Sequence, residues 1–144
     1  MLDPRVIDIN AVARNLLVRG IIAPFRSGKS AEAYKLLWTE NGSPLKFYGE
    51  RLVRQVQQLL GDEYRVELAM RYQTPSIESA IDRLMAVPVE RIVVFPLFPQ
   101  YASATTGSVQ EEVMRVLGKR QIIPDTELIN SYPVHPPLVK LFAG

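Results

Sequence analysis

Hydroxyl groups are concentrated in one short segment, FPLFPQYASATTGS (residues 95–108). Tyr101, Ser103, Thr105, Thr106 and Ser108 follow an apolar run that is interrupted by two prolines. Such hydroxyls can accept hydrogen bonds from the N–H groups at the start of the next helix, or they can face a polar ligand. Both roles stay open for Thr105 and Thr106. The segment is the first place to look for a binding site.

An arginine and a tyrosine stand together after another apolar stretch. Arg71 and Tyr72 follow YRVELAM (residues 64–70), whose alternation is typical of a strand. An arginine at a strand end can bind a carboxylate of a ligand through charge-assisted hydrogen bonds. The alternative is an internal ion pair with a nearby carboxylate such as Glu67 or Asp82.

Two other motifs carry less information. RSGKS (residues 26–30) ends like a phosphate-binding loop, but Ala23 stands where that loop requires a glycine, and no strand is expected before it. His135 is the only histidine and lies between prolines, where a structural or solvated role is more common than a catalytic one. The sequence has no HExxH zinc motif and no GxSxG nucleophile motif.

Composition places the chain among ordinary globular domains. It has 144 residues, of which 47% are hydrophobic and 22% charged, enough for one domain with a core. A net charge of +2 is too small to argue for nucleic acid as a partner. There is no cysteine, and no apolar run approaches the roughly 20 residues that span a bilayer. The acidic, proline-containing start is unlike a signal peptide, so a cytoplasmic location is expected.

Periodicity predicts an α/β fold. The first part is helical, with helices expected over residues 10–19, 30–38 and 45–60 and a stop at Gly61. Strands are then expected at Val66–Met70, Ile92–Pro96 and Glu127–Ile129, separated by helices and followed by a last helix in PPLVKLFA. This order predicts an open parallel sheet with helices on both faces, behind a helical leader. Ligands of such sheets bind beyond the carboxyl ends of the strands, where both polar segments lie.

Four segments give the chain a family resemblance. PLFPQYASATTGSV closely resembles the signature of ferrochelatases, and DPRVIDI, KSAEAYKLLWTENGSPL and AMRYQTPSIESAI resemble other ferrochelatase segments in the same order. The resemblance implies a lyase of haem biosynthesis that inserts ferrous iron into protoporphyrin IX. Iron would be a substrate, and no covalently bound cofactor is implied.

The resemblance also assigns roles to residues. Arg26, Tyr34 and Ser43 match positions that contact a porphyrin propionate, and Arg71 and Tyr72 match a pair on the metal side of the pocket. The hydroxyl segment would contact the porphyrin through Tyr101, Ser103 and Thr106. No catalytic residue and no metal ligand is assigned in this chain. Without the resemblance, Arg26 would be interpreted as a surface arginine, Tyr34 as a half-buried helix tyrosine and Ser43 as a turn serine.

The resemblance covers only the N-terminal half of the family. Residues 1–144 are expected to form one ferrochelatase-like domain that lacks the family's first strand and its C-terminal half, with the catalytic histidine and glutamate. Alone, the chain is expected to be inactive. Its expected partners are that second half, a membrane surface touched peripherally, and a second copy of itself. The alternatives are a small homodimeric tetrapyrrole chelatase and a non-catalytic tetrapyrrole-binding or assembly module.

Overall fold

The computed structural model describes residues 3–40 and 42–143, except for the side chains of residues 26, 27, 29–31 and 33 in one helix. The chain divides into two compact units, Met1–Leu68 and Ala69–Gly144. Each unit is described by itself.

The first unit begins with one continuous helical segment. It consists of α1 (Ala11–Leu16), a π-helical stretch η1 (Leu17–Ile22) and α2 (Ala23–Leu37). The Asn10 side chain accepts a hydrogen bond from the Ala13 N–H at 2.9 Å and so caps α1. Pro24 lies at the junction of η1 and α2 and has no N–H to donate to the helix.

This continuity corrects one prediction and agrees with another. Separate helices over residues 10–19 and 30–38 were expected, and the structure joins them. The RSGKS segment lies inside α2, where the backbone N–H groups serve the helix. It therefore does not form a phosphate-binding loop.

Helix α3 (Pro44–Leu60) ends as predicted at Gly61, whose φ of 74° is readily adopted only by glycine. The Gln57 side chain then organises the chain that follows. Its amide donates to the carbonyls of Gly61 and Tyr64, both at 2.8 Å, and accepts from the Val66 N–H at 2.9 Å. These bonds take the place of a strand ladder.

The predicted strand Val66–Met70 is therefore wrong. Among the described residues of this segment, only Met70 pairs, in an isolated bridge with Ser76. Its alternating apolar residues fit a strand, but within the described part of the chain no strand lies beside it.

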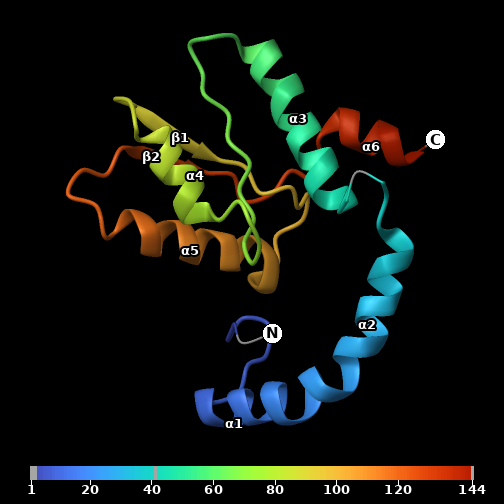
Figure 1. Cartoon of the computed structure of the whole chain (residues 1–144). Helices are drawn as coiled ribbons and strands as arrows, with labels where there is room; N and C mark the ends of the chain where they lie inside the picture. Colours follow the sequence, from blue (N-terminus) through green and yellow to red (C-terminus); the bar gives the residue numbers. More distant parts are fainter. Residues whose placement is uncertain (1–2, 41, 144) are drawn as a thin grey trace. The chain divides into compact units, whose positions relative to one another are not determined.

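The second unit carries the sheet (Figure 1). Its elements are α4 (Ile77–Leu84), β1 (Arg91–Val94), the π-helical turn η2 (Ser103–Gly107), α5 (Ser108–Leu117), β2 (Asp125–Leu128) and α6 (Pro136–Ala143). The two strands are parallel, with Arg91 opposite Asp125 and Val94 opposite Leu128. The predicted parallel α/β arrangement is confirmed, although β1 and β2 each begin and end earlier than expected. Pro96 has no N–H with which to extend β1.

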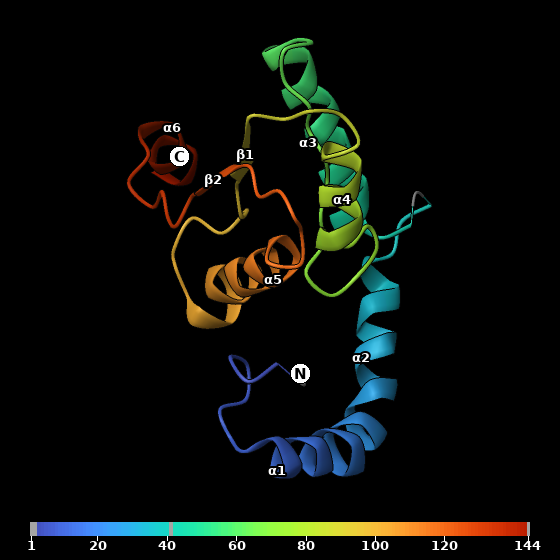
Figure 2. The same cartoon turned by 90° about the vertical axis from the view of Figure 1, so that its left-hand side faces the viewer.

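Helices α4 and α5 pack on one face of this sheet (Figure 2). The buried core consists of Ile77, Ile81, Ile92, Val113, Val116 and Leu117. The Ser76 hydroxyl caps α4 by accepting from the Ser79 N–H at 3.1 Å. On the opposite face of β1, Arg91 and Val93 are exposed. In the part of the chain described, helices thus cover one face of β1, where two covered faces were expected.

No helix within the described residues is both long enough and apolar enough to cross a membrane.

Candidate functional site

The second unit has a groove between the polar segment after β1 and helix α6. Its volume is about 750 Å³, within the range of roughly 300–1,000 Å³ common for small-molecule sites. The lining residues are Phe98, Pro99, Gln100, Tyr101, Ala102, Thr105, Pro133, Leu138, Val139, Phe142 and Ala143. Most of these side chains are apolar and two are phenyl rings, so the groove suits a largely apolar ligand.

Tyr132 fixes the chain that forms one side of this groove. Its N–H donates to the Pro99 carbonyl at 2.8 Å, and its ring stacks on Phe95 with centroids 4.9 Å apart. Burial raises the pKa of the Tyr132 hydroxyl, which donates to the Pro96 carbonyl at 3.4 Å. These contacts hold the exit of β1 against the loop that follows β2.

His135 lines a second, smaller hollow of about 390 Å³ together with Phe95, Tyr132, Pro137, Leu138 and Leu141. Its backbone N–H donates to the Tyr132 carbonyl at 3.2 Å. His135 is exposed and its neighbours are mainly apolar, in keeping with the structural or solvated role expected from the sequence.

The hydroxyl segment is divided between the groove and the interior. Tyr101 is half exposed and lines the groove with Thr105. Ser103 is exposed at the start of η2, whereas Thr106 and Ser108 are fully buried. Among the described residues, the Thr106 Oγ1 has no hydrogen-bond partner. A direct contact between Thr106 and a porphyrin would therefore require η2 to open, and it stays a prediction.

The π-helical turn η2 connects these positions. The Gly107 N–H donates to the Ala102 carbonyl at 3.1 Å, five residues back. Single π-helical turns are uncommon and occur frequently at functional sites. Here the turn places Thr105 in the groove and Ser108 at the start of α5, facing the other way into the unit.

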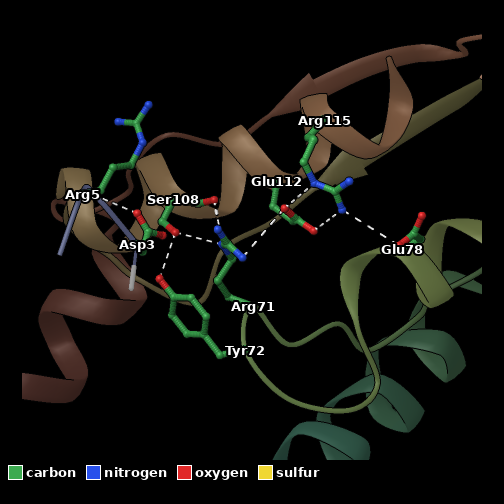
Figure 3. Close-up of polar contacts among 8 residues, drawn as sticks. All are labelled: Asp3, Arg5, Arg71, Tyr72, Glu78, Ser108, Glu112 and Arg115. Carbon is green, nitrogen blue, oxygen red and sulfur yellow. Dashed lines mark hydrogen bonds and ion pairs between the residues drawn. The ribbon is translucent and has the colours of Figure 1, made fainter. Parts of the chain in front are cut away.

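Ser108 brings Arg71 and Tyr72 together (Figure 3). The Arg71 Nε donates to the Ser108 carbonyl at 3.0 Å and to its Oγ at 2.8 Å. The Tyr72 hydroxyl lies 3.1 Å from the same Oγ. The Arg71 guanidinium carbon is 4.8 Å from the centre of the Tyr72 ring, within cation–π range. The predicted pair thus forms one cluster, and its contact with a ligand stays a prediction.

A chain of charges continues behind this cluster (Figure 3). Arg71 Nη1 lies 3.8 Å from Glu112, which accepts two hydrogen bonds from Arg115 at 2.7 and 2.8 Å. Arg115 in turn lies 3.9 Å from Glu78. The hydrogen bond from Arg115 is the main reason that the pKa of Glu112 is lowered, against the opposing effect of burial. Glu112 is therefore a carboxylate at neutral pH.

The carboxylate that the structure places beside Arg71 is Glu112, which was not considered from the sequence. Glu67 lies 3.7 Å from Arg65, and Asp82 forms an ion pair with Arg120. Glu112 was missed because it stands 41 positions further along the chain. Only the packing of α5 brings it to Arg71. The α6 residues that line the groove were not predicted for the same reason.

The predicted propionate residues all belong to the first unit. Tyr34 is 63% exposed on α2, and Ser43 precedes α3 without a side-chain capping bond. The side chain of Arg26 lies outside the described residues. Their meeting around a propionate remains a prediction.

Among the residues described, no group of three or more aspartate, glutamate or histidine side chains could hold a metal ion.

Comparison with known proteins identifies the family. The ferrochelatase family model matches residues 1–144. The chain is 44% identical to the ferrochelatase of Legionella pneumophila (strain Corby) over 138 residues, which cover 96% of this chain and 41% of the relative. It is 39% identical to the ferrochelatase of Alcanivorax borkumensis over 98% of this chain and 42% of the relative. The chain thus spans about two fifths of the length of these relatives. On the strength of a match along its whole length, the chain belongs to the ferrochelatase family.

Proposed function

We propose that the chain takes part in inserting ferrous iron into protoporphyrin IX and that the groove of the second unit forms one wall of the porphyrin site. Membership of the family supports the reaction. The single observation that carries the site is the position of Tyr101 and Thr105, which belong to the family signature and line an apolar groove of suitable volume.

The chemistry of a porphyrin agrees with this wall. The macrocycle is flat and apolar, so it gains from contact with aromatic and aliphatic side chains such as Phe98, Leu138 and Phe142. Its two propionates are anionic and need donors, a role we assign to Arg26, Tyr34 and Ser43. Tyr101, Ser103 and Thr106 would contact the ring from η2 and the residues before it.

Metal insertion also requires proton removal. Two pyrrole N–H protons must leave, and the ring must bend so that its nitrogen lone pairs become accessible. We propose that Arg71 and Tyr72 line the metal side, and that the groups that accept these protons are supplied by residues outside this chain. Iron enters as a substrate in this scheme.

Contact with a membrane surface or another protein is a further part of the proposal. Large apolar side chains on the leader are exposed, including Val12, Phe25 and Leu36. Exposed apolar surface of this kind is found where proteins meet partners or lipid. This apolar surface would become less exposed if a second copy, further chain or lipid covered it.

Porphyrin binding can be measured by fluorescence titration of the 144-residue chain with protoporphyrin IX. Val139→Trp fills the groove, whereas Ile122→Trp adds the same side chain at an exposed position that does not line it. We expect V139W to weaken binding at least roughly tenfold, about 1.4 kcal/mol, and I122W to leave it unchanged. Absence of binding by the unmodified chain, or equal binding by both variants, would contradict the proposed site.

Iron insertion by the chain alone is expected to match a control without protein. The measurement is formation of the metalloporphyrin under anaerobic conditions with ferrous iron. Turnover by the chain itself would favour a small homodimeric chelatase. Binding without turnover, even in the presence of the rest of a ferrochelatase, would favour a non-catalytic binding module.

A further inference from the structure

One buried oxygen atom joins the two residues expected on the metal side of the pocket. Ser108 is fully buried, and its Oγ lies within hydrogen-bond distance of both Arg71 Nε and the Tyr72 hydroxyl. Arginine can only donate, so the Ser108 Oγ must accept from Arg71. The Tyr72 hydroxyl lies 3.1 Å from the same oxygen, and either of the two hydroxyls can be the donor. A single hydroxyl thus sets the positions of a guanidinium and a phenol at the same time.

Glu112 supports this arrangement from one turn further along α5. Its carboxylate is held by two hydrogen bonds from Arg115 and lies 3.8 Å from Arg71 Nη1. Opposite charges therefore alternate along the series Glu78, Arg115, Glu112 and Arg71. The rigid helix fixes the spacing of Ser108 and Glu112, so the guanidinium is held at Nε and faces a counter-charge at Nη1.

We propose that Ser108 and Glu112 are positioning residues, which hold Arg71 and Tyr72 in the one arrangement that the substrate meets. The proposal rests on the proposed function, because Arg71 and Tyr72 are placed at the pocket by that function. Ser108 itself is buried and acts through the two residues that it orients. Loss of its hydroxyl would remove one hydrogen bond from Arg71 and one from Tyr72.

The first test follows the Arg71 side chain directly. In the nitrogen-15-labelled 144-residue chain, the Nε–H signal of Arg71 is assigned by its loss in Arg71→Lys. We expect exchange of this proton with solvent to accelerate at least roughly tenfold in S108A, as expected for loss of a charge-assisted hydrogen bond. E112Q should accelerate it by a smaller factor, because 3.8 Å is long for a direct bond.

Thr126→Val is the matched control. It also removes one hydroxyl bond, from Thr126 Oγ1 to the Pro124 carbonyl at 2.9 Å, in the same unit but away from this cluster. Unchanged exchange in T126V and faster exchange in S108A support the proposal. Equal exchange in S108A and the unmodified chain would overturn the role of Ser108. Equal exchange in E112Q would overturn that of Glu112.

The second test is a double-mutant cycle on protoporphyrin IX affinity. Tyr72→Phe keeps the ring and removes only the hydroxyl. If Ser108 acts through Tyr72, S108A and Y72F should each weaken binding by up to roughly tenfold, and the double variant should bind no worse than the weaker single variant. Independent, multiplying losses would show that Ser108 has only a general structural effect. If the unmodified chain binds no porphyrin, the proposed function fails, while the exchange measurement still decides whether Ser108 positions Arg71.

Discussion

Thr106 carries a buried hydroxyl for which the fold offers no partner. Its side chain is 0% exposed, and its Oγ1 makes no hydrogen bond among the described residues. A buried polar group in this state costs about 1–3 kcal/mol relative to its hydration in the unfolded chain. Thr106→Val has nearly the same shape and removes that cost. We therefore expect T106V to raise the free energy of unfolding by about 1 kcal/mol or more.

Urea unfolding followed by far-ultraviolet circular dichroism measures this change. A gain of 1 kcal/mol also raises Tm by about 2–4 °C in a protein of this size. Thr105→Val is the matched neighbour, because its hydroxyl donates to the Ala102 carbonyl at 3.3 Å. T105V should therefore be neutral or destabilising by up to about 1 kcal/mol. Destabilisation of more than about 1 kcal/mol by T106V would refute the reasoning, since it would show that the Thr106 hydroxyl is bonded in solution.

Three further outcomes are expected from the second unit. Leu117→Ala removes a fully buried core side chain and should lower the free energy of unfolding by about 2–5 kcal/mol. Met114→Ala, at a half-exposed position of the same helix, should change it by about 0.5 kcal/mol or less. Equal effects of the two variants in urea unfolding would show that the core has been assigned to the wrong residues. The lowered pKa of Glu112 in the folded state contributes stability above the unfolded value of about 4.3 that is lost as pH falls through the lower folded value. The stability difference between the unmodified chain and E112Q should therefore shrink below about pH 4, and a pH-independent difference would contradict this. Burial raises the pKa of Tyr132 in the folded state. Its contribution to the free energy of unfolding is therefore present below about pH 10 and is lost as pH rises through the folded pKa. In an absorbance titration, the tyrosine step at highest pH should disappear in Tyr132→Phe.

Local signals in the sequence were sufficient for most helices. The end of α3 at Gly61 follows from a positive φ that only glycine adopts readily. The core stripe of α4, with Ile77 and Ile81, follows from helical periodicity. The parallel pairing of β1 and β2 follows from their separation by a helix, since parallel strands need such a crossover.

The sequence was misleading where pairing partners decide the structure. Val66–Met70 has the alternation of a strand, yet Gln57 binds the backbone that a neighbouring strand would have bound. The π-helical stretch η1 joins α1 to α2 across residues that look like a break, including Gly20. Both outcomes depend on contacts or backbone states that single-sequence patterns do not encode.

The candidate site, too, could be predicted only in part from the sequence. The family signature predicted Tyr101, and an expected strand end, which the structure does not contain, predicted Arg71 and Tyr72. Ser108 and Glu112 could be recognised as neighbours of Arg71 only once α5 was placed against it. The signature also suggested Thr106 as a contact residue, whereas the turn η2 buries it.

The central claim is that protoporphyrin IX binds in the groove between the Phe98–Thr105 segment and α6. Mapping backbone amide shifts of the nitrogen-15-labelled chain during titration with protoporphyrin IX tests it most directly. We expect the largest shifts at Tyr101, Thr105 and Val139, which line the groove, and little change at Arg91 and Asp125, which form an exposed ion pair across the strands. Saturable shifts centred on that ion pair, with the groove unaffected, would contradict the assignment of the porphyrin site.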